Sequence, residues 1–456
     1  MNLPSLVLFL LNRLTQAGFT AYAVGGCVRD SLMGREPHDW DICTSATPER
    51  MKEVFADQRM VETGLQHGTL TVLVDHVPYE ITTYRLDGDY ADHRRPDSVT
   101  FVDRVEEDLS RRDFTVNAMA CGQDGEIIDP FGGREDLGSH LIRCVGEARK
   151  RLEEDALRIL RALRFASVFD FSLEEETSHE IHGQASSLQW VSAERKREEL
   201  LKLLCGPGAG RILREYPDVL AVMIPEIAEM VGLSQNNHHH TYDLWEHTVR
   251  AVENIPPRPD LRLTMLLHDT GKLFTRVTDE NGESHFRGHP DVSAEIAARV
   301  TKDLRLDNET RDRVILLARY HDITLRDDAG RPNTNRAFLL RRLNKFGEQN
   351  LRDLFHVHRA DRIATGYSSV EREDRRLRER EQALDALLAD QACFRLKDLA
   401  VNGYDMMALG LKGPDIGRVL NQLLADVVDG KAENNRDALL ARVPVPGDGK
   451  VAGTDL

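Results

Sequence analysis

Short runs of β-type residues are concentrated in the first third of the chain, and this uneven distribution limits the possible folds more than any other feature. Apolar and β-branched residues dominate the runs 21–24, 69–74, 79–84 and 98–102, and helical stretches separate these runs. Such alternation predicts an α/β domain. After residue 145 the apolar residues recur at helical spacing instead. The sequence therefore predicts an α/β domain followed by a mostly all-α remainder.

Length and changes of pattern divide the chain into four predicted parts. A chain of 456 residues is expected to fold into several units. The α/β part covers 1–145, and a first helical part covers 146–235. A histidine-rich helical block follows over 236–365, and we interpret the polar stretch at its start, including His238, His239 and His240, as a solvated linker. The last part, 366–456, begins with a stretch dense in both charges, which we interpret as a solvated helix face.

The composition excludes several classes of protein. The net charge of −16 rules out a basic protein that coats nucleic acid, so any RNA contact requires a local positive surface. The six cysteines include no C-x-x-C pair, which favours reduced thiols in the cytoplasm over a zinc ribbon or a disulfide framework. Leucines at helical spacing within 3–14 favour an amphipathic helix over a signal peptide, and no apolar run approaches the roughly 20 residues of a membrane span.

Two short patterns near the N-terminus indicate phosphate chemistry. Gly25 and Gly26 follow the apolar run 21–24, where a glycine pair lets the backbone approach a phosphate beside the cationic Arg29. Asp39 and Asp41 are alternate residues of an expected strand, so their carboxylates face the same way. Because they repel each other without a cation, they form a natural Mg²⁺ clamp for attack on a phosphate. Taken singly, the patterns also fit an ordinary turn and an exposed loop.

The combination Gly-Gly-x-Val-Arg-Asp followed by Asp-x-Asp is much more specific. It resembles the head of class II nucleotidyltransferases of the DNA polymerase beta superfamily, a family that contains CCA-adding enzymes and bacterial poly(A) polymerases. Three further stretches match in order. The stretch 111–119, with Arg112, Asp113 and Asn117, resembles the family's ribose- and phosphate-contacting motif, 129–133 its head-to-neck hinge, and 154–161 its nucleobase-selecting motif.

This resemblance covers about 15–235 and resumes near 395. It implies a polymerase-type head over 1–145 and a helical neck and RNA-binding body over 146–235. It also implies that Asp39 and Asp41 are catalytic and hold Mg²⁺, that Gly26, Arg29, Arg112, Asp113 and Asn117 bind the nucleotide, and that the partners are tRNA, CTP and ATP.

Asp155 and Arg158 are the candidates for choosing the base. Their spacing of three places them on one helical face, where a carboxylate and a guanidinium match the hydrogen-bonding edges of cytosine and adenine but mismatch guanine and uracil. An ordinary surface ion pair is the competing interpretation. Arg158, Arg161 and Arg164 recur at helical spacing, and 143–164 holds seven Lys or Arg against four Asp or Glu. We therefore expect this helix to bind the triphosphate and the RNA end, although Arg164 also fits simple packing of its stem.

The roles of two features of the predicted head are not decided by the sequence pattern. Glu80 is either a third carboxylate near the metal or an ordinary glutamate of an edge strand. The polar segment 85–97 reads as a mobile loop. In the family a loop at this place helps to switch specificity from C to A, which favours full CCA addition over addition of C alone.

A second constellation of potential metal ligands lies in the histidine-rich block. Six residues follow one another there in the order His247, His268, Asp269, His289, His321 and Asp361. The order resembles the HD superfamily, which implies that His247, His268, Asp269 and Asp361 are metal ligands and that His289, His321 and Lys272 contact a phosphate or a second metal. Imidazole and carboxylate ligands suit Ni, Mn, Co or Fe, or Mg with more oxygen ligands. A lone buried histidine is more often structural, but six ordered matches favour a site.

The stretches 399–405 and 411–417 resemble the body and tail of some CCA-adding enzymes, although a plain connection between helices fits them equally well.

Our leading hypothesis is addition of C, C and A to the 3′ end of tRNA, with a metal-dependent phosphohydrolase in the HD block. The alternatives are a bacterial poly(A) polymerase, a CC-only or A-only enzyme, and an HD phosphohydrolase whose head merely binds RNA. The HD site also fits a metal retained only for folding.

Overall fold

The computed structural model describes the chain except for residues 63, 66–67, 89–97, 237–240, 328 and 445–456. By its contacts the chain divides into two units. The first contains Met1–Leu233, Pro257–Leu263 and Ala298–Asn308, and the second contains Ser234–Pro256, Thr264–Ala297 and Glu309–Leu456. The finer division into head, body, HD block and tail remains a prediction. The expected linker around His238 and most of the polar loop 85–97 lie outside the described residues.

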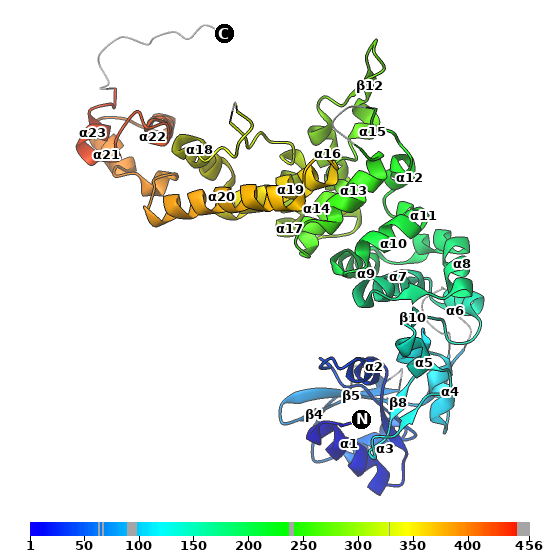
Figure 1. The fold of residues 1–456 in the computed structure, drawn as a ribbon. Helices are drawn as coiled ribbons and strands as arrows, with labels where there is room; N and C mark the ends of the chain where they lie inside the picture. The colour runs from blue at the N-terminus through cyan, green and yellow to red at the C-terminus, as the bar shows by residue number, and fades with distance from the viewer. Residues whose placement is uncertain (63, 66–67, 89–97, 237–240, 328, 445–456) are drawn as a thin grey trace. The chain divides into compact units, whose positions relative to one another are not determined.

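A seven-stranded mixed sheet forms the centre of the N-terminal part (Figure 1), with the strand order β3-β4-β5-β2-β1-β8-β9. β2 and β5 pair in parallel, whereas the other neighbours are antiparallel. The strands are β1 Ala21–Val24, β2 Ile42–Thr44, β3 Arg59–Val61, β4 Thr69–Val74, β5 Val77–Thr83, β8 Ala120–Cys121 and β9 Ile127–Ile128. The predicted α/β fold of this part is confirmed.

The two faces of this sheet carry different apolar clusters because side chains alternate along each strand. Ala21, Ala23 and Ile42 join the cluster that also contains the buried leucines of helix α1, and we call this side the α1 face. Val24 and Cys43 belong to the cluster on the other side, which includes residues of helix α4 and is called the α4 face. The alternation fixes which strand residues can point toward a common site.

Helices cover both faces of the sheet. Val7, Leu10, Leu11 and Leu14 of α1 are buried, which confirms the predicted amphipathic helix. The helices of this part are α1 Ser5–Gln16, α2 Gly26–Leu32, α3 Pro48–Val54, α4 Val105–Ser110, the 3-10 turn η2 Thr115–Asn117 and α5 Gly133–Gly138. A separate hairpin joins β6 Arg85–Asp87 to β7 Val99–Phe101, so the described ends of the expected loop are paired strands.

The rest of the chain is almost entirely helical, as predicted. The first group comprises α6 Ala148–Glu154, α7 Leu157–Phe169, α8 Glu175–Gly183, η3 Ala185–Trp190, α9 Ala193–Cys205, α10 Ala209–Glu215, α11 Pro217–Ala221 and α12 Glu226–Met230. The second comprises α13 Leu244–Glu253, α14 Pro259–Leu267, α15 Lys272–Thr275, α16 His289–Asp303, α17 Asn308–Arg319, α18 Arg336–Phe346, α19 Glu348–Ala364, α20 Val370–Ala389, η4 Leu396–Asp398, α21 Gly403–Ala408, α22 Pro414–Val428 and α23 Arg436–Leu440. Two short ladders accompany them, β10 Leu141–Ile142 with β11 Ser172–Leu173, and β12 Val277–Thr278 with β13 Ser284–His285.

One expectation about this region is wrong. The charged stretch at the start of the last part lies in α20, but it is not a uniformly solvated face, because Glu373, Arg376 and Arg380 are buried. Segments between α17 and α18 also approach this side of α20, since Arg380 Nη2 donates to the carbonyl of Leu325 over 3.3 Å.

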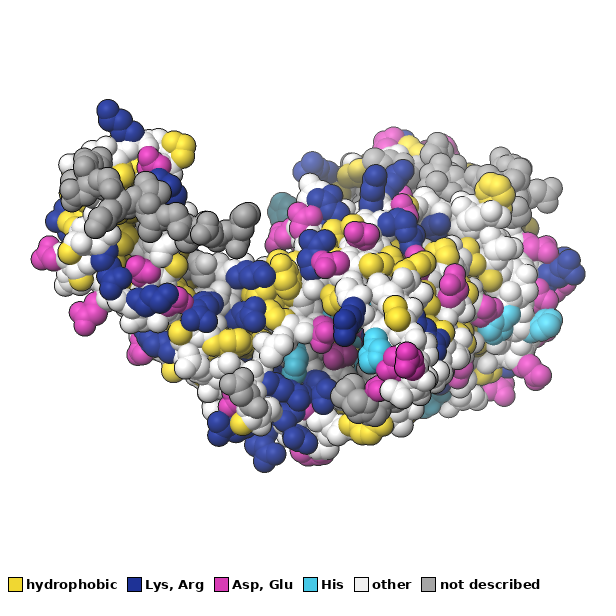
Figure 2. Space-filling view, turned by 90° about the horizontal axis from the view of Figure 1, so that it is seen from above, with side chains coloured by type: hydrophobic (Ala, Val, Ile, Leu, Met, Phe, Trp, Pro, Cys, Tyr) yellow, Lys and Arg dark blue, Asp and Glu magenta, His cyan; other side chains and the backbone are white. Residues whose placement is uncertain are grey.

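The surface and the thiols agree with the composition. Basic and acidic side chains are interspersed over the face seen in Figure 2. All six cysteines are free thiols. Among the described residues, no helix combines the length and the apolar character that crossing a membrane requires.

Candidate functional sites

The first site forms where β2 begins. Asp39 and Asp41 lie in the residues that lead into β2, not in the strand itself as predicted, although the Asp41 carbonyl accepts a hydrogen bond of 2.9 Å from Val24 N and so continues the ladder. Trp40 packs against the α1-face cluster. The alternation of side chains therefore directs Asp39 and Asp41 toward the α4 face.

A third carboxylate joins them. Glu80 stands on β5 between Tyr79 and Ile81, both of which belong to the α1-face cluster, so Glu80 also points to the α4 face. Desolvation by nearby protein atoms raises the pKa of Asp41, Arg112 opposes this shift, and the charges of Glu80 and Asp39 add to it. Asp41 itself is exposed. Mutually repelling carboxylates that remain open to solvent fit a site for a divalent cation.

Arg112 acts on these carboxylates, and other residues predicted to bind the nucleotide lie near it. Gly25 has a positive φ of 82°, which favours glycine, and a Cβ there would lie only 2.9 Å from Nη1 of Arg112. Gly26 begins α2. Arg29 Nη1 donates to Asn117 Oδ1 over 2.5 Å, and its guanidinium lies over the rings of Phe165 and Phe169. The structure thus brings the predicted Gly26, Arg29, Arg112 and Asn117 into one neighbourhood.

Asp113 holds this neighbourhood together. Its Oδ2 accepts two hydrogen bonds from Arg161, of 2.8 and 2.5 Å, and its Oδ1 accepts from Asn117 Nδ2 and from the amide of Phe114. Burial would raise the pKa of Asp113, but Arg161 and Asn117 hold it well below its usual range. Both carboxylate oxygens are therefore occupied, and Asp113 orients Asn117 and Arg161.

The predicted placement of Asp155 and Arg158 on one helical face is wrong. Asp155 is not in a helix: it follows the last residue of α6 in an extended conformation, with φ −139° and ψ 105°. Its Oδ1 accepts from the Leu157 amide and so caps the start of α7, while its Oδ2 lies 2.8 Å from Nη2 of Arg195 on α9. Asp155 precedes α7 and does not lie within it. The spacing of three residues therefore does not place Asp155 and Arg158 on one helical face.

Arg158 and Arg164 are both paired with glutamates that lie outside α7. Arg158 Nη1 lies 2.5 Å from Glu154 Oε2 and donates to the Arg151 carbonyl over 2.8 Å. Arg164 is paired with Glu199 at 2.5 Å, and its guanidinium lies 3.9 Å from the ring centroid of Phe165. Both arginines lie in α7, as does Arg161, so their predicted helical spacing is confirmed.

The second site brings together all six ordered histidine and aspartate residues. His247 comes from α13, His289 begins α16, and Asp361 comes from α19. His268 and Asp269 follow α14, which ends at Leu267, four residues before the expected end near Gly271. The ligand atoms form two groups, each within 4.8 Å: His247, His268, Asp269 and Asp361, and Asp269, His289 and His321. Asp269 belongs to both groups.

Hydrogen bonds to the backbone fix the orientation of three of these imidazoles. Nδ1 of His268, His289 and His321 each contacts the carbonyl three residues earlier, at 2.7 to 2.8 Å. Because a carbonyl only accepts, each Nδ1 carries a proton, and Nε2 is the ring nitrogen that faces the cluster. The Nε2 atoms of His289 and His321 are 3.1 Å apart. Two ring nitrogens this close together, beside the shared carboxylate of Asp269, fit a cation bound between or beside them.

The charges of the cluster support the same conclusion. Burial would lower the pKa of His268, but the carboxylates of Asp269 and Asp361 raise it to about 10. Lys272 Nζ lies 2.7 Å from Asp269 Oδ2 and also donates to Gln235 Oε1 over 2.9 Å. The two carboxylates thus strongly favour positive charge beside them.

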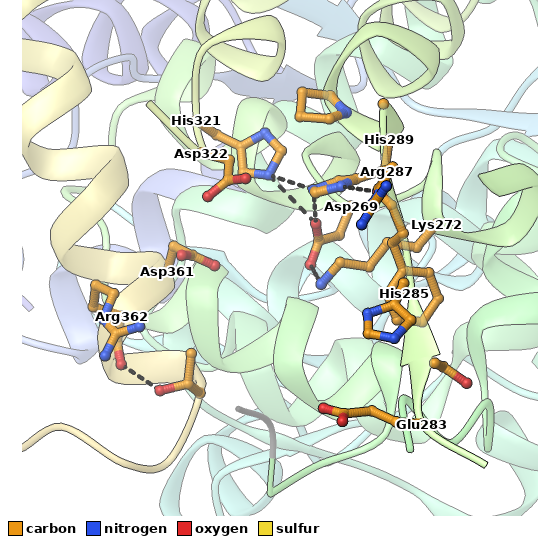
Figure 3. Close-up of a pocket in the computed structure, with 15 residues that line it drawn as sticks. Asp269, Lys272, Glu283, His285, Arg287, His289, His321, Asp322, Asp361 and Arg362 are labelled. Atoms are coloured by element: carbon orange, nitrogen blue, oxygen red, sulfur yellow. Dashed lines mark hydrogen bonds and ion pairs between the residues drawn. The ribbon is translucent and has the colours of Figure 1, made fainter. Parts of the chain in front are cut away.

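The cluster opens into a cavity of about 620 Å³ (Figure 3). Asp269, His289, His321 and Lys272 converge at one end of it, and Asp361 approaches from the side of α19. Arg287 and Arg362 also line the cavity. Neither arginine was among the predicted site residues, although Arg362 directly follows Asp361 and Arg287 stands two residues before His289.

Three family models match the chain. The model described as "Poly A polymerase head domain" matches residues 21–143, the one described as "Probable RNA and SrmB- binding site of polymerase A" matches 170–230, and the one described as "tRNA nucleotidyltransferase domain 2 putative" matches 291–443. Together with the sheet and the carboxylate site, they define a chain with a poly(A)-polymerase-type head and a helical body.

Comparison with individual relatives identifies the family more narrowly than the three family models do. The CCA-adding enzyme of Geobacillus kaustophilus is 42% identical over 281 residues, which cover 60% of this chain and 67% of the relative. A crystal structure of the Bacillus stearothermophilus CCA-adding enzyme in complex with CTP is 30% identical, with a TM-score of 0.69 and 97% of both chains covered. The chain belongs to the family of CCA-adding enzymes.

The matched segments are shorter for other curated relatives. The CCA-adding enzyme of Lactobacillus helveticus is 49% identical over 227 residues, which cover 50% of this chain. The chain spans little more than half of that relative, 56% of its length. The resemblance of the block 236–365 to the HD superfamily remains a prediction that rests on the geometry of its side chains.

Proposed function

We propose that this chain adds C, C and A to the 3′ end of tRNA from CTP and ATP, without a nucleic-acid template and with release of pyrophosphate. The observation that carries this proposal is the convergence of Asp39, Asp41 and Glu80 on one face of the sheet, beside Arg112. Membership of the CCA-adding family, and the CTP bound in the solved Bacillus relative, support the choice of substrates.

Each group of residues has a proposed role. Asp39 and Asp41 are the catalytic residues and would hold Mg²⁺, which when bound supplies positive charge to the attacking 3′-hydroxyl and to the α-phosphate. Gly26, Arg29 and Arg112 contact the triphosphate and the sugar. Asp113 and Asn117 keep Arg161 and Arg29 oriented through the hydrogen bonds described above. Asp155 and Arg158 select the base.

The assay uses purified protein and tRNA that ends at the discriminator base. Incubation with CTP, ATP or both, followed by sequencing of the 3′ ends, should give CC with CTP alone and CCA with both nucleotides. Long A tails would instead identify a poly(A) polymerase, and addition restricted to C or to A would identify a partial enzyme.

We also infer a cytoplasmic location, which the six free thiols support.

We further propose that the histidine–aspartate cluster is a metal-dependent phosphohydrolase site. The adjacent Nε2 atoms of His289 and His321, with Asp269 shared between the two ligand groups, favour this second function. His247, His268, Asp269 and Asp361 hold a divalent metal (Ni, Mn, Co, Fe or Mg), which when bound supplies Lewis acidity and an activated water. His289 and His321 hold a second metal or a phosphate, and Lys272 balances phosphate charge.

Hydrolysis would complement nucleotide addition, because a damaged RNA end needs a free 3′-hydroxyl before it is extended. The protein should release phosphate from 2′,3′-cyclic or terminal phosphates in the presence of Ni²⁺, Mn²⁺, Co²⁺ or Mg²⁺. His268→Ala combined with Asp269→Ala is the negative control. If no substrate is hydrolysed with any metal, the phosphohydrolase proposal is wrong and the metal serves folding alone.

A further inference from the structure

Four arginines lie close to one another, and one of them, Arg362, lines the cavity of the histidine–aspartate cluster. Arg326 lies in the segment between α17 and α18, Arg362 lies near the end of α19, and Arg376 and Arg380 lie four residues apart on α20. Arg362 also lines the cavity, on the side opposite Lys272 (Figure 3). We call these four side chains the arginine cluster.

Several guanidinium nitrogens of the arginine cluster are buried without a hydrogen-bond partner. They are Nε and Nη1 of Arg380, Nη2 of Arg326 and Nε of Arg362. Arg380 is only 1% exposed and Arg376 only 8%. Two backbone carbonyls satisfy part of the remaining donors, because Arg380 Nη2 donates to Leu325 and Arg376 Nη2 to Gly330. Buried donors are normally satisfied, so these nitrogens require an explanation.

The positive charge of the arginine cluster is not balanced by the protein around it. Within the described part of the chain, its one ion pair joins Arg376 Nη1 to Glu373 Oε1 at 2.6 Å. Burial lowers the pKa of Arg380 to about 10, and the like charges of Arg326 and Arg376 act in the same direction while Glu373 opposes them. Burial together with Arg362 lowers the pKa of Arg326 as well. Among the described residues, the four guanidinium groups are opposed by the carboxylates of Glu373 and Glu379, so positive charge is in excess.

An anion resolves this imbalance. An uncompensated buried charge is strongly unfavourable unless a partner of opposite sign reaches it. Planar guanidinium groups present paired donors that match the oxygens of a phosphate. The unsatisfied nitrogens of Arg326, Arg362 and Arg380 supply such donors, and Arg362 also lines the cavity that contains the metal-ligating groups.

We propose that the arginine cluster binds a phosphate group, and that this group belongs to the substrate whose terminal or cyclic phosphate reaches the histidine–aspartate cluster. The proposal rests on the phosphohydrolase function and narrows its substrate. The preferred substrate is a nucleotide or an RNA end with at least two phosphorus centres, one at the metal ligands and one at the arginines. Arg362, which lines the cavity and belongs to the arginine cluster, connects the two positions.

Phosphate binding is measured first, without metal, so that it does not depend on hydrolysis. Calorimetry of the full-length protein in the presence of a chelator uses inorganic phosphate, pyrophosphate and a 3′-phosphorylated dinucleotide in separate titrations. Arg326→Gln should raise the Kd of the ligand at least tenfold. Arg378→Gln changes an exposed arginine of α20, the helix that carries Arg376 and Arg380, and should leave the Kd unchanged. Equal binding by wild type, Arg326→Gln and Arg378→Gln would overturn the proposal.

Measuring the unfolding temperature shows whether a variant that binds phosphate weakly is still folded. Without phosphate, Arg326→Gln should unfold at the same temperature as the wild type or higher, because the substitution relieves repulsion between like charges. With saturating phosphate only the wild type and Arg378→Gln should gain stability. A loss of stability in Arg326→Gln without any change in phosphate binding would show that the arginine is structural and would contradict the proposal.

Hydrolysis then distinguishes the sources of the phosphate. With metal present, Arg326→Gln should lower kcat/KM for the 3′-phosphorylated dinucleotide at least tenfold and leave that for a 3′-mononucleotide nearly unchanged. Tight binding of pyrophosphate with weak binding of the dinucleotide would overturn the RNA-end substrate and identify a free polyphosphate as the ligand. If no substrate is hydrolysed, the phosphohydrolase function is wrong, while the metal-free titrations still decide whether the cluster binds phosphate.

Discussion

The carboxylate of Asp155 pairs with Arg195, 40 residues further along the chain, and not with Arg158, three residues away. Arg195 Nη2 lies 2.8 Å from Asp155 Oδ2, and the partner of Arg158 is Glu154. Arg195 on α9 therefore holds the proposed base-selecting carboxylate, although it stands outside the motif that suggested this role. The pair gives the first prediction.

We expect Arg195→Ala to reduce discrimination against UTP and GTP, because Asp155 loses the donor that orients it. Asp155→Ala should have the same effect and a larger loss of rate. The ratio of kcat/KM for CTP over UTP should fall by on the order of tenfold, which corresponds to one hydrogen bond between charged groups. Glu198→Gln, an exposed change on the same helix, serves as the control. An equal loss with all four nucleotides would make Asp155 a structural ion-pair partner only.

Asp41→Asn should lower the rate of nucleotide addition by roughly a hundredfold or more, because one carboxylate of the metal clamp is lost. Its unfolding temperature should stay the same or rise, since the charges of Glu80 and Asp39 raise the pKa of Asp41 and so disfavour its ionised form. The two measurements are a primer-extension assay on tRNA and a thermal melt. Glu53→Gln, an exposed carboxylate on α3, should affect neither. Near-normal turnover of Asp41→Asn would place the clamp elsewhere.

The buried pair of Asp113 and Arg161 predicts a dependence of stability on pH. The folded-state pKa of Asp113 lies well below its usual value of about 3.9. A lowered carboxyl pKa contributes stability above the unfolded-state value, and this contribution is lost as the pH falls toward the folded-state value. Asp113→Asn should therefore reduce the free energy of unfolding by about 1 to 3 kcal/mol at pH 7.

Urea denaturation at several pH values measures this effect. The difference between wild type and Asp113→Asn should shrink as the pH falls below about 4. Asp57→Asn removes an exposed carboxylate and provides a comparison at the surface. A difference that stays constant down to pH 3 would show that Asp113 acts through packing and hydrogen bonding alone.

The histidine–aspartate cluster should bind divalent metal with or without turnover. Elemental analysis after dialysis against Ni²⁺ or Mn²⁺ should find bound metal in the wild type and a severalfold lower content in His268→Ala with Asp269→Ala. His289→Ala should lose metal only if the second ligand group holds an ion of its own. His182→Ala, an exposed histidine that pairs with Asp218, is the matched control. Equal metal content in the wild type and the double variant would contradict the metal site.

Much of the molecule follows from local patterns in the sequence. The alternation and spacing of apolar residues predicted β1, β4 and the amphipathic helix α1, because burial of one face requires those periods. The same periodicity placed Arg158, Arg161 and Arg164 on one helix. The alternation of side chains around Trp40 also put Asp39 and Asp41 on one face, even though β2 begins only at Ile42.

Tertiary structure decided the partners of the charged side chains. The break between α6 and α7 turns Asp155 toward α9, and the packing of α20 against its neighbours buries Arg376 and Arg380 on a face that the sequence predicted to be solvated. Residue spacing fixes directions only within one element. An ion pair or a buried cluster depends on which elements pack together, and the sequence does not display those long-range contacts. This is why the order of the histidines and aspartates predicted a metal site, while the arginines that border its cavity became visible only in the fold.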